Sequence, residues 1–475
     1  MNPSPFPTLL FSAVCLSACM VGPDYQKPDT ATPAQWQTPV ANTVTAKPVA
    51  LKHWWQTFND PILTSLIQQA QTGNRDLFQA EARIREARAR RQLAVANLLP
   101  TSSINASASQ SGSSEAANNI NVPGFDLTND LYSNTLDASW ELDIFGKRRR
   151  SLESSAASLQ ASEEDLRDVL VSLCAEVALN YVDVRGYQQR LAITEANLAA
   201  QQETFDITYW REQAGLVSGL DLVQAKLTLE NTRASLPSLR SSLEQAKHRL
   251  AALLGNPPAA LQTLLDKSAA IPVATAQIMT GIPADVLRQR PDIRRSERKL
   301  AAQTAQIGVA EAARYPSFNL SGSIGVESLL TSNLYTASAK TFQMAASSAW
   351  VLFDSGRIRS NVAIQTALQE QALGAYQATV LTALRDVENA LTAYTQEQQR
   401  RTALQASVQA GISAMALANE QYQSGTVDFQ RVLDSQRSLL SAQTQLATSE
   451  AEIAANVVRL YKALGGGWQT EQAHG

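Results

Sequence analysis

The sequence has few residues of the kinds that build metal or redox sites. Only three cysteines (Cys15, Cys19 and Cys174) and three widely separated histidines occur among its 475 residues. Their spacing fits no zinc-binding pattern, so we expect neither a metal site nor a cofactor. The chain also lacks a Walker loop, a GxGxxG motif after a strand, a GxSxG motif and an HExxH motif. We therefore predict that the protein is not an enzyme.

The chain also lacks a charge excess, and it lacks proline over two long stretches. It carries 40 Lys plus Arg against 43 Asp plus Glu, a formal net charge of -3. This balance argues against nucleic acid as a partner, because nucleic-acid binders present a basic face. No proline lies between Pro123 and Pro237, and none follows Pro316. Proline breaks helices, so very long helices are possible in both stretches.

The N-terminus is similar to the signal of a bacterial lipoprotein. Residues 8–18 are apolar but too few to span a bilayer, and Leu-Ser-Ala precedes Cys19 as in a lipobox. We expect a signal peptide over 1–18, acylation of Cys19 and an extended tether over 19–52. Residue Met20 replaces the aspartate that retains such lipoproteins in the inner membrane, so the resemblance implies the outer membrane. The alternative is a plain signal peptide with an incidental cysteine.

The chain contains an internal repeat with an offset of 210 residues. The pairs at this offset include Trp140 and Trp350, Gly146 and Gly356, Gly215 and Gly425, and Gly255 and Gly465. Apolar residues spaced by seven from Leu222 to Leu250 recur from Val432 to Leu460. Such a spacing predicts left-handed coiled coils. The predicted divisions are a first repeat over 53–255, a segment with prolines over 256–290, a second repeat over 291–467 and a tail over 468–475.

Each repeat contains one helix that is far longer than a globular domain needs. Positions 146–215 and 356–425 have no proline, and each predicts a helix of roughly 100 Å. Shorter helices are predicted over 220–254 and 292–314, with 75–99 as the counterpart of the latter. A long helix beside two shorter ones stacked end to end is the expected arrangement.

Four stretches between the helices alternate apolar and polar residues, near 101–112, 132–143, 317–327 and 341–353. This alternation is typical of strands in an outer-membrane barrel. Four strands cannot close a barrel, because the open edges would leave unpaired backbone groups in lipid. Three copies give twelve strands, whereas two give a narrow eight-stranded barrel. The predicted fold class is therefore mainly α with a membrane β-barrel, closed in a homotrimer.

At this point the residues resemble those of the TolC-like outer membrane factors, in particular the NodT-type lipoprotein branch of resistance-nodulation-division efflux systems. The segments that carry the resemblance are Arg290-Pro291-Asp292-Ile293-Arg294 continuing to Tyr315-Pro316-Ser317, then Trp54 or Trp55 with Phe58, Asp60-Pro61 and Leu63, and Leu433-Asp434-Ser435-Gln436-Arg437-Ser438-Leu439. The resemblance covers nearly the whole chain.

The resemblance implies an outer-membrane duct. In this family a trimer forms a twelve-stranded barrel and a twelve-helix periplasmic tunnel, with an equatorial belt that here comes from 256–290 and the terminal segments. The tunnel is passive. An inner-membrane resistance-nodulation-division pump energises it through a periplasmic adaptor, and the outer membrane lipid surrounds the barrel. Drugs, metal ions and polypeptides all leave cells through such tunnels, so the sequence does not name the cargo.

The resemblance also implies a closed periplasmic tip with a polar lock. Asp221 matches an acidic residue that pairs with a tyrosine of a neighbouring helix, here Tyr422. Asp434 matches an acidic ring of the tip. The TolC prototype has a second aspartate where this chain has Arg431, and it has an arginine where this chain has Val427. One lock contact and one ring are therefore altered.

Asp428 is expected to restore part of the negative charge at the tip. The alternative for all of these charges is simpler, because Asp221 and Asp434 lie near helix N-termini, where the helix dipole favours carboxylates. The basic run 147–150 is predicted beneath the membrane, either meeting lipid phosphates or in water. Cys174, on a heptad helix, is expected to pack rather than react.

The rival function is a structural or adhesive coiled-coil periplasmic lipoprotein without a channel. It explains the lipobox and the heptads but leaves the four alternating stretches unexplained.

Overall fold

The structure is a computed structural model of the chain. It describes residues 20–29, 33–38, 44–45, 51–114, 128–274, 278–279, 283, 286 and 289–468. The predicted signal peptide, the acylation site Cys19 and most of the predicted tail lie outside the described residues.

The chain divides into two compact units, each assembled from three stretches. The strand unit comprises Met1–Pro28, Ile84–Ser162 and Ser296–Tyr376, and the helix unit comprises Asp29–Arg83, Glu163–Arg295 and Gln377–Gly475. Each 210-residue repeat contributes to both units. The sequence repeats are therefore not the compact units of the fold.

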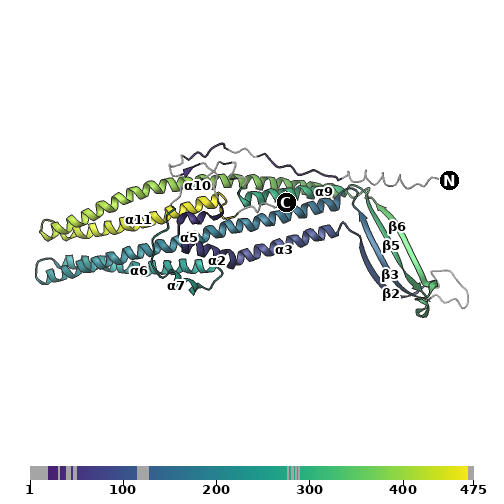
Figure 1. Ribbon diagram of the computed structural model, residues 1–475, viewed down its shortest axis with the longest axis horizontal. Helices are drawn as coiled ribbons and strands as arrows, with labels where there is room; N and C mark the ends of the chain where they lie inside the picture. The colour runs from purple at the N-terminus through teal and green to yellow at the C-terminus, as the bar shows by residue number, and fades with distance from the viewer. Residues whose placement is uncertain are drawn as a thin grey trace. The chain divides into compact units, whose positions relative to one another are not determined.

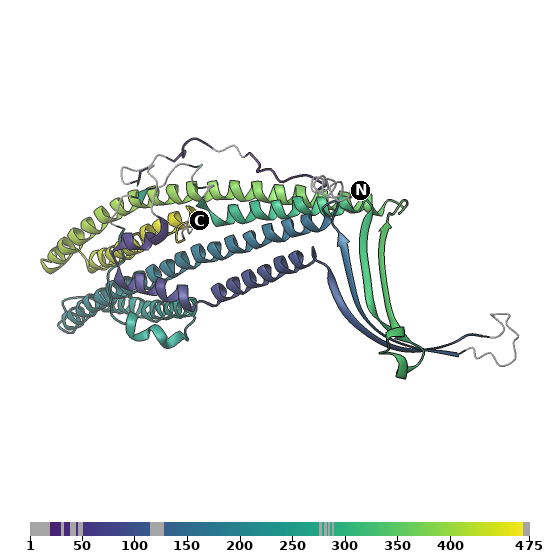
Figure 2. The ribbon, with the colours of Figure 1, turned by 45° about the vertical axis from the view of Figure 1, so that its right-hand side comes forward.

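The strand unit contains an antiparallel four-stranded sheet, shown in Figure 2. Its order is β2 (Thr101–Gly112), β3 (Thr128–Leu142), β5 (Ser317–Ser328) and β6 (Lys340–Ala349). Two short 3-10 helices, η4 (Thr331–Asn333) and η5 (Ala337–Ala339), lie in the connection between β5 and β6. The sheet confirms the four predicted strands.

The predicted end of the last strand at residue 353 is wrong. β6 ends at Ala349, and the indole N–H of Trp350 donates to the carbonyl of Arg314 at 3.1 Å. The carboxylate of Asp354 then accepts the backbone N–H groups of Gly356 and Ile358, which starts the next helix. A helix cap therefore takes the place of the last strand residues.

The two faces of the sheet differ in polarity. One cross-strand row consists of Ile104, Leu136, Ile324 and Phe342, which are 80%, 49%, 63% and 80% exposed. The adjacent row, on the opposite face because side chains alternate along a strand, consists of Ser103, Asp137, Ser323 and Gln343. The sheet thus has an exposed apolar face and a polar face. Contact with water is favourable for the polar face and unfavourable for the apolar face.

The two repeats join strand to helix in the same way. The indole N–H of Trp140 donates to the carbonyl of Leu98 at 2.9 Å, just as that of Trp350 donates to the carbonyl of Arg314. These carbonyls follow α3 (Arg75–Ala96) and α9 (Pro291–Ala312). The two tryptophans 210 residues apart therefore play the same structural role, which is to tie a strand to the end of a helix.

The long helices form as predicted. They are α5 (Lys147–Gln213) and α10 (Arg357–Gln423), each of 67 residues. The returning helices are α6 (Gly219–Leu253) and α11 (Phe429–Ala463), each of 35 residues. Figure 1 shows α5 with α6 and α10 with α11 as two helical hairpins.

The basic run at the start of α5 binds protein atoms. Arg148 donates to Glu141 at 2.6 Å and Arg149 to Asp143 at 3.3 Å. Arg150 is only 1% exposed, which corrects the expectation of a lipid-facing or solvated charge. Burial of its guanidinium requires partners, since an unpaired buried charge is costly.

The partners of Arg150 come from the first described residues of the chain. Its guanidinium donates to the carbonyls of Val21 and Gly22 at 3.1 and 3.0 Å, and to the carboxylate of Asp24 at 2.8 Å. Glu153 accepts the remaining bond at 2.8 Å. The segment is extended, as predicted for a tether, but at this end it is held against α5.

Gly22 is required in this contact. Its φ is +89°, and a Cβ at this position would lie 2.4 Å from the Cα of Gly308 in α9. The residues further along are also bound, because the hydroxyl of Tyr25 donates to Glu297 at 3.2 Å and Lys27 pairs with the same carboxylate at 3.5 Å. The polypeptide directly after the predicted acylation site is therefore held by contacts with α5 and α9.

The core of the helix unit lies around the Trp54 motif. The remaining elements are η2 (Leu51–Phe58), α2 (Pro61–Gly73), η3 (Pro258–Leu261) and α7 (Gln262–Leu265), and β1 (Val44–Thr45) pairs in parallel with β4 (Ile278–Met279). Trp54 stacks on Tyr461 of α11 with ring centroids 5.3 Å apart. Asp60 caps α2 and accepts the hydroxyl of Tyr181 at 2.6 Å. This core ties η2 and α2 to both long helices.

Among the residues described, no helix combines the length and the apolar character needed to cross a membrane.

Candidate gate at the helical tips

The two helical hairpins end in matching turns. Gly215 and Gly425 have φ values of +71° and +77°, a conformation that glycine adopts without strain. In each turn the glycine N–H donates three residues back, to the carbonyl of Glu212 or of Tyr422. No atom would contact a Cβ at either position, so the backbone conformation alone explains the two glycines.

Two carboxylates just after the turns, those of Asp221 and Asp428, take part in helix caps. Ser218 caps α6 in a capping box, in which the carboxylate of Asp221 accepts the Ser218 N–H at 3.1 Å and its hydroxyl at 2.9 Å. Asp428, 210 residues after Ser218, caps α11 by accepting the N–H of Arg431. Arg431 is the counterpart of Asp221, and a cation there cannot return the second capping bond. Asp221 and Asp428, two of the five predicted gate residues, therefore cap helices, as the alternative interpretation as helix-end charges expects.

Asp434 and Arg431 are exposed on the first turns of α11. Asp434 accepts a hydrogen bond from the side-chain amide of Gln430 at 2.9 Å. Both side chains are therefore accessible to water in this chain.

Tyr422 lies in a different environment. Its ring packs on Phe429 with centroids 5.2 Å apart, and the guanidinium carbon of Arg211 lies 4.7 Å from its ring centroid. The hydroxyl is buried and has no hydrogen-bond partner among the described residues. Burial raises the pKa of Tyr422; nearby Arg211 opposes this shift and nearby Asp221 adds to it. The hydrogen bond expected between Tyr422 and Asp221 is therefore not present in this chain, in which the Asp221 carboxylate accepts the N–H and the hydroxyl of Ser218 in the α6 cap.

The two hairpins of a protomer pack together near their tips. Ala225 joins Ala418, Phe429, Val432 and Leu433 in a buried apolar cluster. Two side-chain hydrogen bonds lie beside this cluster. Gln436 donates to Thr204 at 2.8 Å, and Arg437 donates to Thr228 at 2.8 Å.

Sequence reasoning missed Arg211. Nothing in its position, four residues before the tip glycine Gly215, indicates that it stacks on a tyrosine 211 residues away. The only available signal was that the arginine of the prototype is absent at Val427, which leaves the lock without its cation.

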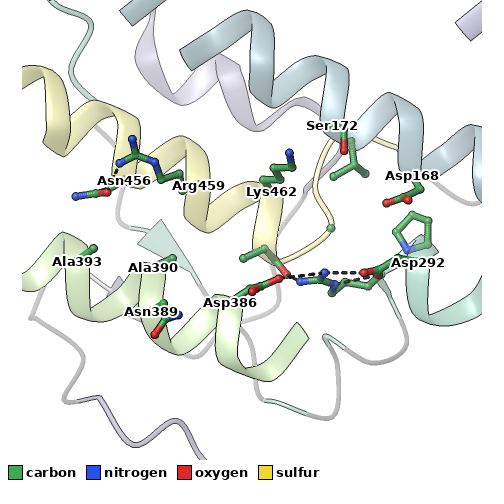
Figure 3. A pocket seen from close by; sticks show the side chains of 15 residues that line it. Asp168, Ser172, Asp292, Asp386, Asn389, Ala390, Ala393, Asn456, Arg459 and Lys462 are labelled. Carbon is green, nitrogen blue, oxygen red and sulfur yellow. Dashed lines mark hydrogen bonds and ion pairs between the residues drawn. The ribbon is translucent and has the colours of Figure 1, made fainter. Parts of the chain in front are cut away.

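The Arg290 motif has a structural role beside a cavity of about 400 Å³, shown in Figure 3. Arg290 donates twice to Asp292, at 3.0 and 2.6 Å, and once to the carbonyl of Ala463 at 2.9 Å. It thereby joins the start of α9 to the end of α11. Asp386 lies 3.6 Å from the same guanidinium. The motif is explained by this junction without any chemistry.

The model of the family described as outer membrane efflux protein matches residues 66–256 and 282–466. The chain belongs to this family. It is 35% identical to nodulation protein T of Rhizobium leguminosarum bv. viciae over 95% of this chain and 92% of that protein. It is 32% identical to the probable efflux pump outer membrane protein TtgC of Pseudomonas putida over 98% and 97%.

Solved structures of outer membrane channels are similar over almost the whole chain. The outer-membrane channel OprN has a TM-score of 0.88 and 37% identity, covering 95% of this chain and 100% of that one. The Campylobacter jejuni CmeC outer membrane channel has a TM-score of 0.89 and 25% identity, covering 96% of each chain. The predicted family and the mainly helical fold with four strands are thus confirmed. The roles of individual tip residues stay predictions.

Proposed function

We propose that three copies of this outer membrane efflux protein form a passive duct across the outer membrane and the periplasm, as the outer-membrane channel of a tripartite efflux pump. The observation that carries the proposal is the four-stranded sheet with one exposed apolar face and one polar face. In a closed barrel the row that contains Ile324 meets lipid, and the row that contains Ser323 faces an aqueous lumen.

Closure requires other copies of the chain. β2 and β6 are the edges of the sheet, and unpaired edge groups in lipid cost several kcal/mol each. Pairing β6 of one protomer with β2 of the next, three times, gives twelve strands and leaves no edge. Two copies would give eight strands, whose interior is filled by side chains.

Lipid attachment at Cys19 completes the anchorage in the outer membrane. The proposal is supported by Met20, the residue after Cys19, whose side chain packs closely against Gly146. Gly146 directly precedes α5 and lies four residues after β3. An acyl chain that starts there enters the bilayer close to the base of the barrel. The expected partners are a periplasmic adaptor and an inner-membrane resistance-nodulation-division pump.

The tip residues form the gate in this proposal. Three copies of exposed Asp434 around one axis make an acidic ring that attracts cations, and the nearby Arg431 partly neutralises it. Asp428 adds a carboxylate that is shared with the α11 cap. Asp221 and Tyr422 belong to the lock between helices.

Planar-bilayer recording of the purified, membrane-extracted protein tests the proposal. We expect heat-modifiable trimers that give discrete, cation-preferring conductance steps. Asp434→Asn is expected to lower the cation preference and the block by trivalent cations, while Asp76→Asn, an exposed first-turn carboxylate of α3 in the same chain, leaves both unchanged. A protein that migrates as a non-heat-modifiable coiled-coil oligomer and gives no conductance would favour the structural lipoprotein instead.

A further inference from the structure

The carboxylates that line the cavity beside Arg290 already have cationic partners. The cavity lies within the helix unit, and the side chains labelled in Figure 3 come from α5, α10 and α11 and from the start of α9. Each of its three carboxylates pairs with an arginine: Asp168 with Arg295 at 3.0 Å, Asp292 with Arg290 at 2.6 Å, and Asp386 with Arg385 at 3.0 Å. A cationic ligand would therefore find no free carboxylate in the cavity.

Two other polar groups of the lining have no partner. The ammonium of Lys462, in the last turn of α11, makes no ion pair and no hydrogen bond with the described residues. The hydroxyl of Ser172, on α5, likewise has no hydrogen bond in the described part of the chain. A lysine offers donors and no acceptor, so the open binding capacity of the cavity suits an anionic acceptor such as a carboxylate.

The remaining wall of the cavity is largely apolar. Its apolar side chains are those of Val171, Pro291, Ala390, Ala393 and Ala463. A volume of about 400 Å³ holds more than a carboxylate alone. The ligand that would use both the free donors and the apolar wall is a small amphiphilic organic anion.

We propose that this cavity is a transit site for small amphiphilic organic anions on the inner wall of the duct, with the ligand carboxylate held by Lys462 and Ser172. The inference rests on the proposed function and gives it a class of cargo. Three copies of the chain supply three such sites. Binding is expected to be weak, because a site in a conducting path must also release its ligand.

The orientation of α11 places the cavity on the lumen side of the proposed duct. Tyr461 belongs to the core that contains η2 and α2, whereas Arg459 and Lys462 line the cavity. In a closed ring of helices, one face of the wall borders the lumen and the other is outside. Three copies of the layer formed by η2 and α2 would fill a tunnel if they pointed inward. In a duct that layer is outside, and the cavity opens to the lumen.

Lys462 also has a simpler role, because a cation in the last turn of a helix interacts favourably with the helix dipole. The internal repeat shows that this role is not needed for the fold. The position equivalent to Lys462 at the 210-residue offset is Ala252, near the end of the returning helix α6. An alanine therefore suits this place, and Lys462→Ala is expected to fold.

The charge preference of the cavity tests the proposal. 2-Naphthoate and its neutral counterpart 2-naphthamide are titrated against the purified full-length protein, with ligand-observed saturation-transfer NMR as the readout. Naphthoate is expected to bind roughly 10- to 100-fold more tightly than naphthamide. Lys462→Ala is expected to remove this preference by weakening the binding of naphthoate alone, and Lys462→Arg is expected to keep it.

Lys267→Ala is the matched control. This exposed lysine of the helix unit also lacks an ion pair with the described residues, and it lies outside the lining of the cavity. The control is expected to keep the wild-type preference. Equal binding of the two ligands to the wild type, an unchanged preference in Lys462→Ala, or its loss in Lys267→Ala would each overturn the inference.

Planar-bilayer recording tests whether the site lies in the conducting path. Naphthoate is expected to interrupt the wild-type current, with interruptions that shorten in Lys462→Ala roughly in proportion to the loss of affinity. Naphthoate that binds with the expected preference but leaves the current of an active channel unchanged would overturn the transit site. A wild-type protein that binds naphthoate but gives no conductance would overturn the proposed function instead.

Discussion

Removal of the guanidinium of Arg150 is expected to release the N-terminal segment from α5. Arg150→Met keeps an aliphatic side chain and deletes three hydrogen bonds to the segment, to Val21, Gly22 and Asp24. A hydrogen bond that involves a charged group contributes about 1.5–3 kcal/mol. The bond to Asp24 is worth only about 0–1 kcal/mol, because that carboxylate is 80% exposed.

The hydrogen bonds to the carbonyls of Val21 and Gly22 account for most of the free energy that Arg150→Met removes. The two carbonyls regain water when the segment detaches, so the net loss is about 2–4 kcal/mol rather than the full sum. Since about 1.4 kcal/mol changes an equilibrium constant tenfold, the detached fraction rises roughly 30- to 1000-fold. Asp24→Asn, which weakens only the exposed pair, is expected to change the fraction less than about tenfold.

Hydrogen exchange of residues 20–28 and chymotrypsin cleavage after Tyr25 measure the detached fraction in the purified protein. Arg148→Met is the control, because that guanidinium binds Glu141 and the carbonyl of Asn97 and does not reach the segment. If Arg150→Met leaves exchange and cleavage at the wild-type rates, the guanidinium does not hold the segment and the reasoning is refuted.

Three further predictions concern the anchor, an acid-sensitive contact and the lone thiol. Cys19→Ser is expected to abolish incorporation of labelled fatty acid, and continued labelling would refute the acylation site. Burial raises the pKa of Glu388, but hydrogen bonds from Thr38 and Gln37 outweigh it, so the pKa lies below its ordinary value. The contact of Glu388 with Thr38 and Gln37 is then fully formed above about pH 4.3 and is lost as the pH falls through the lowered pKa. Hydrogen exchange of residues 33–38, corrected for intrinsic rates, is therefore expected to rise at pH 3. In Glu388→Gln the corrected exchange is expected to be insensitive to pH. Burial raises the pKa of the Cys174 thiol to about 11, so a maleimide at pH 8 is expected to label it only after unfolding. Rapid labelling of the native protein would contradict its burial.

Much of this architecture was predictable from local patterns. The 210-residue offset and the absence of proline predict α5 and α10 to within two residues at each end, because helix periodicity and turn glycines are local signals. The alternation of polar and apolar residues predicts the four strands for the same reason. The predicted end of β6 was wrong, because the alternation of apolar and polar residues continues through Trp350 and Leu352. The helix cap at Asp354 ends the strand earlier.

The contacts that join distant segments were not predictable. Arg150 reads as one charge of a basic run, and its burial depends on Val21 and Gly22, 129 and 128 residues earlier. The contact of Arg211 with the ring of Tyr422 likewise joins residues that are far apart in the sequence. Pairing across such separations is decided by tertiary packing, which a single sequence does not record.

The sidedness of the sheet tests the proposed duct most directly. Ser323→Cys and Ile324→Cys are adjacent on β5 but belong to opposite faces. A membrane-impermeant maleimide is added to the protein in intact outer-membrane vesicles, where buried Cys174 contributes no background. The account predicts labelling at position 323, in the aqueous lumen, and protection at position 324, in lipid. Equal labelling of both positions, or labelling at position 324 alone, would contradict a closed membrane barrel.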